Sequence, residues 1–406
     1  MNIKQRRLVM LLVISMMMTL SGAVSLLRAD NGTCGGANVT LPFADVASSG
    51  FFCQIAEAYF AGLTSGTSAT TFGPGNNVTR EQMAAFITRT LDQSLRRGSR
   101  RAALKQFWTT QGPFDAPLTS VGNGASGVAC DGTDLWVANY SSGTVSRVRA
   151  SDGKLLETWT GADGASRVLV ARGRIYVTGG SNNPAKLYRI DPTQPAGPVT
   201  TLNVDLGPSV DDIAFDGDRI WISSFIGGGV YLLSFGLLCS PCVTHVTTGL
   251  TATLGLVYDG SNMWVTNPSD GALKKLDANG NVILSVPVGV FPKYAVFDGT
   301  NIWALNNIGN SDGSIAVVRA STGAVIATLT GNGLKGPLDA AFDGERILVT
   351  NEGPGNGDTV SLWKASDLSP LGSVQVGLNQ GGVNGVCSDG LNFWITLRLA
   401  GKLARF

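Results

Sequence analysis

From about residue 120 onward, the chain repeats one short pattern of apolar and polar positions. An apolar run leads to Asp-Gly, two variable residues follow, and a second apolar run contains a large aromatic side chain. Short apolar runs joined by Gly-containing turns are typical of β-hairpins. The copies begin at Cys130, Phe215, Tyr258, Phe297, Phe342 and Ser388, and a copy without Asp-Gly begins at Val170.

The spacing of the large residue in each copy predicts the fold. These residues are Trp136, Tyr176, Trp221, Trp264, Trp303, Leu348 and Trp394. The average interval is about 43 residues, because six intervals separate residues 136 and 394. A period of roughly 40–45 residues with several short strands in each unit indicates a β-propeller with four strands per blade. In the copy around Trp264, we expect strands over 254–258, 263–266, 273–276 and 282–286.

The two ends of the repeated region predict how the ring closes. After Trp394 the chain has room for only one more strand, at Lys402 to Phe406. The segment from Phe107 to Val121 belongs to no other blade. Pairing it into the last blade hides both sheet edges. We therefore expect a mainly β chain in which residues 107–406 form a seven-bladed β-propeller, its N-terminal strand completing the blade of Trp394.

Two copies carry a resemblance to known propeller repeats. Val265-Thr266-Asn267 and Val349-Thr350-Asn351 are similar to the repeats of bacterial propellers of the YVTN and NHL types. This resemblance implies the fold and says little about function, because propellers support many functions.

The first 29 residues have the pattern of an export signal. Lys4, Arg6 and Arg7 precede an uncharged apolar run from Leu8 to Leu20, and small residues follow. We expect a signal peptide over 1–29 and hence an exported protein, with a retained membrane anchor as the alternative.

A separate module is expected over residues 43–92. Phe51 to Phe60 has the pattern of an amphipathic helix, and a Gly-rich turn follows it. Thr79 and Gln82 form a capping-box pattern at the start of a second helix. The module is therefore predicted to be a small helix, loop and helix.

This module resembles the S-layer homology domain. The matching segments are Phe43-Ala44-Asp45-Val46, Tyr59 to Gly66, Phe72-Gly73-Pro74 and Val78 to Ala84. Sets of such domains bind anionic polymers of the bacterial cell wall, and an arginine in the last motif contributes to binding. The resemblance implies this role for Arg80, and a solvated first helical turn is the alternative. The family usually carries three copies, and this chain has one.

A basic segment over 93–106 is predicted to be a helical linker. Arg96, Arg97, Arg100, Arg101 and Lys105 lie among helix-forming residues. Either an anionic wall polymer or lipid surface attracts this segment, or it is a solvated spacer.

The six cysteines fit an oxidising destination. We expect a Cys34–Cys53 disulfide and consider Cys239–Cys242 a further candidate pair. A redox or metal site at Cys239-x-x-Cys242 is the alternative, although no histidine cluster accompanies it. The sequence leaves the pairing of Cys130 and Cys387 open, and each is expected in a buried strand.

Composition and motifs give little support for catalysis. The net charge is +1, so nothing indicates nucleic acid binding, and charged residues make up 15% of the chain. The chain has one histidine, His245, and no P-loop, EF-hand or G-x-S-x-G motif. We therefore expect no catalytic residue, no cofactor and no metal site. The Asp of each Asp-Gly pair is expected to stabilise its turn.

The best ligand-binding candidates come from topology. If the second strand of each blade returns to the face where the first began, polar residues gather there around the channel mouth. These residues are Asn139, Asp211, Asp212, Asn267, Asn306, Asp339 and Asn351. They are candidates to bind a peptide, a protein or a glycan. The alternative is that asparagine simply ends a strand and begins a turn.

The sequence as a whole predicts an exported, envelope-associated binding or scaffold protein without catalytic activity. Its expected partners are a cell-wall polymer or envelope component at the module, and a protein, peptide or glycan at the propeller. An exported lyase or hydrolase with a carboxylate and metal site at the channel mouth is the main alternative. A purely structural array protein is the third.

Overall fold

The computed structural model describes residues 29–34, 37–60, 64–80, 82–84, 86–87, 118–180, 184–235, 241–307, 309, 312–353, 359–376 and 382–406. The chain divides into two compact units, residues 1–106 and 107–406. The predicted signal peptide over 1–29 lies outside the described residues except for its last residue. The basic segment over 93–106 lies wholly outside them.

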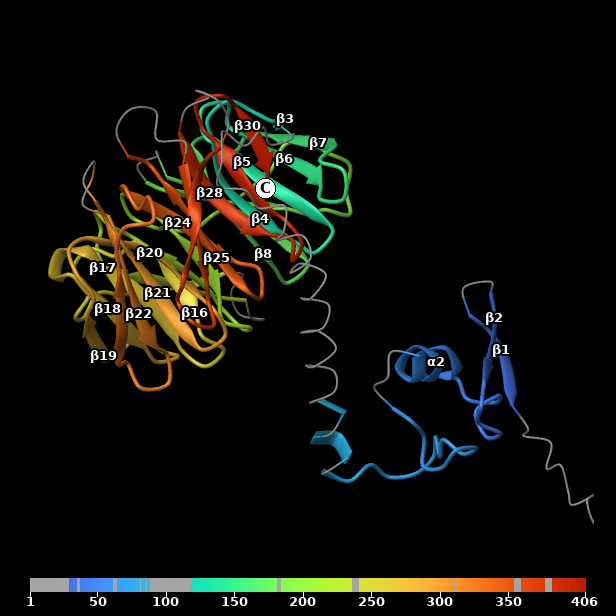
Figure 1. Ribbon diagram of the computed structural model, residues 1–406. Coiled ribbons are helices and arrows are strands. Elements are labelled where there is room, and N and C mark those ends of the chain that lie inside the picture. The colour runs from blue at the N-terminus through green and yellow to red at the C-terminus, as the bar shows by residue number, and fades with distance from the viewer. Residues whose placement is uncertain are drawn as a thin grey trace, which may run out of the picture. The chain divides into compact units, whose positions relative to one another are not determined.

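The second unit is a seven-bladed β-propeller, as the repeats predict. Each blade is a four-stranded antiparallel sheet (Figure 1). Blade 1 consists of β4 (Ala125–Cys130), β5 (Asp134–Asn139), β6 (Thr144–Arg149) and β7 (Leu155–Thr160). Blade 2 consists of β8 (Ala165–Ala171), β9 (Arg174–Gly179), β10 (Lys186–Ile190) and β11 (Thr200–Leu202). Blade 3 consists of β12 (Ile213–Phe215), β13 (Ile220–Ser223), β14 (Val230–Ser234) and β15 (Cys242–Val246).

The remaining blades follow the same order. Blade 4 consists of β16 (Leu256–Tyr258), β17 (Met263–Asn267), β18 (Ala272–Leu276) and β19 (Val282–Pro287), with a short 3₁₀ helix η2 (Pro268–Asp270) after β17. Blade 5 consists of β20 (Pro292–Phe297), β21 (Asn301–Asn306), β22 (Ser314–Arg319) and β23 (Val325–Leu329). Blade 6 consists of β24 (Pro337–Phe342), β25 (Arg346–Asn351), β26 (Thr359–Lys364) and β27 (Pro370–Gln375).

Blade 7 closes the ring as predicted. Its strands are β28 (Val383–Ser388), β29 (Phe393–Leu397), β30 (Lys402–Arg405) and, from the start of the domain, β3 (Leu118–Ser120). Leu118 pairs with Ala404 and Ser120 pairs with Lys402. The closing strand is shorter than the expected segment from Phe107 to Val121, and residues 107–117 lie outside the described residues.

The repeated aspartate and tryptophan fix each turn to its blade. Asp131 Oδ1 accepts the backbone N–H groups of Thr133 and Asp134, and its Oδ2 accepts Trp136 Nε1 at 2.9 Å. The same arrangement recurs at Asp216, Asp259, Asp298 and Asp389 with Trp221, Trp264, Trp303 and Trp394. The predicted structural role of these aspartates is confirmed.

Each of these tryptophans also joins two blades. Trp264 of blade 4 packs against Ile302 and Ala304 in the second strand of blade 5. Trp394 of blade 7 packs likewise against Leu135 and Val137 of blade 1. A buried tryptophan removes roughly 150–250 Å² from water, so these contacts supply much of the energy that holds the ring together.

Hydroxyl groups at the end of the second strand form a further link between blades. Thr266 Oγ1 accepts the N–H of Gly255 at 2.8 Å in its own blade and donates to the carbonyl of Lys293 at 2.8 Å in the next. The threonine of the Val-Thr-Asn motif therefore bridges two inner strands. The same bridge is made by Ser223 to Leu254, Thr350 to Asn384 and Thr396 to Ser126.

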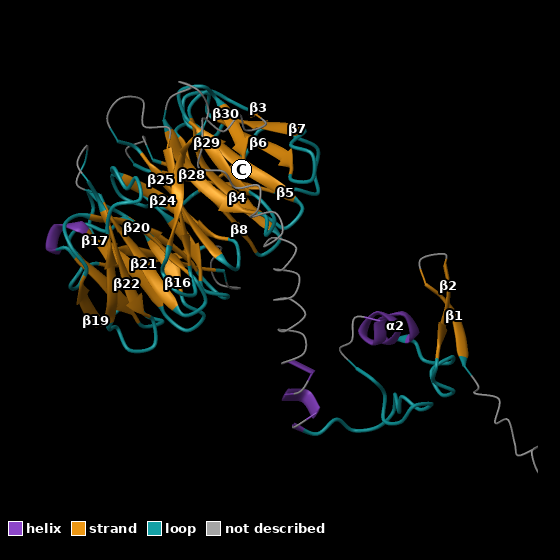
Figure 2. Cartoon of the chain, viewed as in Figure 1, coloured by secondary structure: helices purple, strands orange, loops and turns teal. Residues whose placement is uncertain are grey.

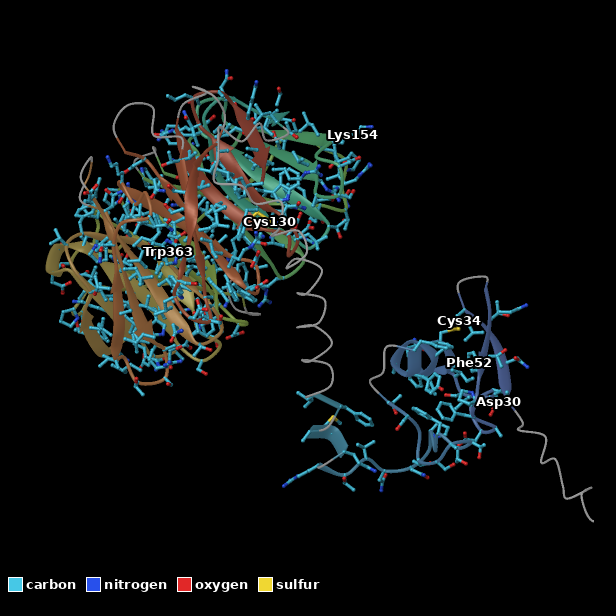
Figure 3. All side chains as sticks on the ribbon, in the orientation of Figure 1. Asp30, Cys34, Phe52, Cys130, Lys154 and Trp363 are labelled. Carbon is cyan, nitrogen blue, oxygen red and sulfur yellow. A yellow bond between two sulfur atoms is a disulfide. The ribbon has the colours of Figure 1, made fainter. Side chains whose placement is uncertain are left out.

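The described part of the first unit contains a hairpin that the sequence analysis did not anticipate. Strands β1 (Asp30–Cys34) and β2 (Ala37–Leu41) precede helix α2 (Phe52–Phe60), which matches the expected first helix (Figure 2). Leu41, Phe43, Phe52 and Ile55 form the centre of its core. The predicted Cys34–Cys53 disulfide is confirmed and ties β1 to α2 (Figure 3).

Candidate functional site

In each blade, one residue in or directly before the inner strand faces the propeller channel at the same level. These positions are equivalent because, in five blades, the backbone N–H of this residue donates to a hydroxyl at the end of the second strand. Inner strands line the central channel of a propeller. In blade order the residues are Gly127, Arg167, Asp212, Gly255, Tyr294, Asp339 and Gly385.

The three glycines permit close packing of neighbouring blades. A Cβ atom on Gly127 would lie 2.5 Å from the carbonyl oxygen of Ser166, and one on Gly385 would lie 2.5 Å from that of Ser126. A Cβ atom on Gly255 would lie 2.6 Å from Tyr294 Cα. The functional groups at this level therefore come only from the other four blades.

Arg167 joins those four blades. Its Nη1 lies 2.8 Å from Asp339 Oδ2, and its Nε lies 4.0 Å from Asp212 Oδ1. The guanidinium carbon lies 4.0 Å from the centre of the Tyr294 ring. The arginine of blade 2 thus reaches blade 6 while contacting blades 3 and 5. Sequence reasoning missed Arg167, because its repeat copy lacks the Asp-Gly that marks the others.

The predicted grouping of Asp212 and Asp339 is present in the structure, since both lie against Arg167. Burial raises the pKa of Asp212 to about 6, against the lowering effect of Arg167. Burial also raises the pKa of Tyr294 and of Asp211, the residue before Asp212. The site therefore contains a carboxyl group that titrates near neutral pH.

We expect Asp212→Asn to change how stability depends on pH. Because the folded-state pKa of Asp212 exceeds its unfolded value, its favourable contribution is present below about pH 4 and is lost as pH rises through 6. Between pH 4.5 and 7.5, the free energy of unfolding of the variant should therefore rise by about 2 kcal/mol relative to that of the parent. Urea unfolding at both values measures this. The charged and titratable groups facing Asp212 are Arg167, Asp339 and Tyr294. If the free energies of unfolding of the parent and the variant differ by the same amount at both pH values, the raised pKa of Asp212 is contradicted.

Asp211 lies at the channel mouth next to an aromatic contact. Its Oδ2 accepts the backbone N–H of Phe225 at 2.6 Å, and the Phe225 ring lies 6.3 Å from that of Phe291. On the adjoining side, Lys293 Nζ lies 2.8 Å from Glu352 Oε1, which also accepts Asn307 Nδ2. The mouth thus combines carboxylates, one amide and an exposed aromatic pair.

The four predicted asparagines lie at the ends of their second strands with buried side chains. Nδ2 of Asn139, Asn306 and Asn351 donates to a serine of the third strand in each blade. Asn267 instead receives the backbone N–H groups of Thr251 and Ala252. Their amide nitrogens or oxygens are thus used within the blades. Of the seven predicted mouth residues, Asp211, Asp212 and Asp339 are the ones that remain partly exposed.

The other sequence candidates lie away from the channel. His245 is in the outer strand β15, stacked on Tyr231 at 4.0 Å, with Nε2 2.9 Å from the carbonyl oxygen of Gly228. Cys242 begins the same strand and is disulfide-bonded, while Cys239 lies outside the described residues. Within the described ranges, no three His, Cys, Asp or Glu side chains gather as metal ligands.

The ring also has a covalent link that the sequence left undecided. A Cys130–Cys387 disulfide joins the inner strands of blades 1 and 7 across 257 residues of sequence (Figure 3). It lies at the same seam as the closing strand β3. The first and last blades are therefore joined by a disulfide as well as by strand pairing.

The first unit presents Arg80 on a capped helix. Gln82 Oε1 accepts the N–H of Thr79 at 2.9 Å, and Thr79 Oγ1 accepts the N–H of Gln82 at 3.1 Å, so the predicted capping box is confirmed. Arg80 is exposed in the first turn. Asp45 explains the Phe-x-Asp-Val motif, because its carboxylate accepts the N–H groups of Phe72 and Gly73 and so fixes the loop before the helix.

Comparison with solved structures agrees with the propeller fold. The structure of streptogramin B lyase has a TM-score of 0.56 and 15% identity, covering 71% of this chain and 96% of its own. Virginiamycin B lyase of Staphylococcus aureus, in a catalytically inactive histidine-to-alanine form with quinupristin, has a TM-score of 0.57 and 14% identity, covering 72% and 99%. The WD40 propeller domain of Doa1 has a TM-score of 0.57 and 15% identity, covering 72% and 96%. At these identities the likeness concerns the fold alone.

The sequence comparisons concern the first unit. No curated protein sequence matches the chain. Within the described part of the chain, no helix is both long enough and apolar enough to span a membrane. Residues 42–84 match the family model of the S-layer homology domain. The chain therefore joins an S-layer homology domain, which indicates a bacterial cell-surface protein, to a seven-bladed β-propeller.

Proposed function

We propose that this chain is an exported, cell-envelope-associated binding protein. In this proposal the S-layer homology module attaches to an anionic wall polymer, and the propeller binds a protein, peptide or glycan without catalysing a reaction. The observation that carries the proposal is the family match over 42–84, in a module that presents an exposed Arg80 directly after the capping residue Thr79.

The chemistry of the helix start supports anion binding at Arg80. A helix N-terminus carries a partial positive charge, and a guanidinium forms strong paired hydrogen bonds with phosphate or carboxylate oxygens. The capping box occupies Thr79 and Gln82 with each other, which holds the first turn in place. Arg80 is then free of helix-capping duties and exposed to a polymer.

Two observations support binding over catalysis at the propeller. The two lyases above share its fold, and one is described as inactive when a histidine becomes alanine. The one histidine of this chain, His245, lies in an outer strand instead of the channel. In addition, Arg167 lies against both channel carboxylates, Asp212 and Asp339, and neutralises part of their charge.

We expect Arg80→Ala to weaken attachment to wall material about tenfold or more, because a charge-assisted hydrogen bond contributes about 1.5–3 kcal/mol. Co-sedimentation of the exported chain with purified bacterial cell walls measures this. The charge-matched control is Arg149→Ala, which removes an exposed arginine of the propeller. Cell walls stripped of their anionic polymers should retain neither the parent nor either variant. Equal sedimentation of both variants and the parent would remove Arg80 from the proposal.

A further inference from the structure

A strained aromatic residue marks the channel mouth between blades 3 and 5. The residue before the inner strand has a positive φ in five blades, and its carbonyl accepts the N–H that follows the second strand. In four blades this residue is glycine, namely Gly124, Gly164, Gly336 and Gly382. In blade 5 it is Phe291, with a φ of 52°.

Phenylalanine is a poor choice for this backbone position. A bulky side chain strains the left-handed conformation, and Pro292, which follows, further disfavours it. Backbone strain persists where the surroundings impose it, and it concentrates at binding sites. Folding alone favours glycine here, as in the other four blades, so the aromatic side chain needs a separate reason.

The Phe291 side chain is part of an exposed apolar patch. It contacts the Phe225 ring, and the adjoining residues Ile226 and Val290 are 74% and 65% exposed. We call these four residues the mouth patch. Contiguous apolar side chains on a surface indicate a binding site more strongly than scattered ones do.

The charges around the mouth patch indicate which partner it fits. Two cations, Arg167 and Lys293, face the carboxylates of Asp212, Asp339 and Glu352 at 2.8 to 4.0 Å. Asp211, hydrogen-bonded to the Phe225 backbone, adds a fourth carboxylate beside the patch. When all are ionised, two positive and four negative groups leave two net negative charges. The mouth therefore favours a cation that carries an apolar neighbour.

We infer that the mouth patch and Asp211 bind a peptide segment in which a lysine or arginine side chain lies beside an apolar side chain. The apolar side chain packs on Phe225 and Phe291, and the cation lies against Asp211. This inference rests on the proposed binding function of the propeller and specifies the class of its partner.

The test uses three acetylated hexapeptide amides and the full exported chain. One peptide alternates leucine with lysine, the second replaces lysine with glutamate, and the third replaces leucine with serine. Isothermal titration should show the first peptide binding roughly tenfold or more tightly than the other two, because both the apolar and the cationic contacts are needed. Equal binding of the glutamate peptide would overturn the inference.

Phe291→Gly separates binding from folding. We expect roughly tenfold or greater loss of affinity for the leucine–lysine peptide, with a melting temperature that is unchanged or raised, because glycine fits the positive φ. Asp211→Asn should also weaken binding of the leucine–lysine peptide. Ile283→Ala, which changes an exposed apolar residue on outer strand β19, should leave binding of this peptide unchanged. Unchanged affinity in Phe291→Gly would overturn the inference, as would a fall in melting temperature without a fall in affinity.

A parallel titration with soluble wall glycans distinguishes this inference from the proposed function. If the parent binds a glycan but none of the peptides, and Phe291→Gly abolishes the glycan binding, the cationic peptide is rejected as the ligand. The proposal that the propeller is a binding domain is then retained. Binding of no probe would reject the inference, while attachment through Arg80 is measured independently with whole walls.

Discussion

Arg167→Met is expected to lower the free energy of unfolding of the propeller by about 3–5 kcal/mol at pH 7.5, which is the usual effect of removing one partner from a buried ion pair. The methionine keeps most of the aliphatic volume but leaves Asp212 and Asp339 facing each other in the channel. Their charges then lack the guanidinium that lies 2.8 Å from Asp339. Urea unfolding followed by tryptophan fluorescence measures the change.

The pH dependence identifies the cause of this loss. Without Arg167, the folded-state pKa of Asp212 rises further, because the lowering effect of the guanidinium is lost. Protonation of Asp212 then relieves the repulsion, so the deficit should shrink as pH falls towards 4.5. Arg149→Met is the matched control, because its partner Asp152 lies on the surface and such pairs contribute about 0–1 kcal/mol. A deficit of equal size at both pH values would mean that lost packing, and not charge, explains the effect.

The propeller could be predicted from the sequence because its construction repeats. Five of the six repeated Asp-Gly turns are hydrogen-bonded to a tryptophan five residues later, so the spacing of these residues records one blade after another. The closing strand followed from counting strands in the last copy. The hairpin over 30–41 was missed, since its strands carry no strong apolar alternation.

The candidate site was harder to predict, because it depends on details that do not repeat. Topology correctly brought Asp212 and Asp339 to one place, but the buried state of Asn139, Asn306 and Asn351 depends on serines of the third strand. The role of Arg167 depends on the residue type at one position of blade 2, because the equivalent positions of the other blades carry glycine, aspartate or tyrosine. The position of Phe291 is unusual only beside the glycines of other blades, which requires a residue-level alignment of the inner strands.

The Cys130–Cys387 pair illustrates the same limit. Cys130 directly precedes Asp131, whereas Cys387 lies two residues before Asp389, so the two cysteines are not at the same repeat position. Bulges in β4 and β28 shift the register of both inner strands. Only the assembled ring brings the two sulfur atoms together, because blades 1 and 7 become neighbours on closure.

Replacing both Cys130 and Cys387 by alanine is expected to lower the free energy of unfolding by about 2–5 kcal/mol, towards the upper end because the disulfide closes a loop of 257 residues. Changing both residues avoids an unpaired thiol. The seam then depends on the three residue pairs between β3 and β30 and on the bridge from Thr396 to Ser126. Chemical unfolding without reductant measures the loss.

Reduction provides the internal control for this prediction. The Cys34–Cys53 disulfide lies in the other unit. Cys242 of blade 3 is also disulfide-bonded, and we expect that bond to contribute little to the stability of the propeller. The Cys130→Ala, Cys387→Ala double variant should therefore show the same propeller unfolding transition with and without dithiothreitol. The parent should shift to the transition of the variant when reduced. If the parent and the variant unfold alike under oxidising conditions, strand pairing and the Trp394 contact with blade 1 are sufficient to close the ring, and the disulfide adds no measurable stability there.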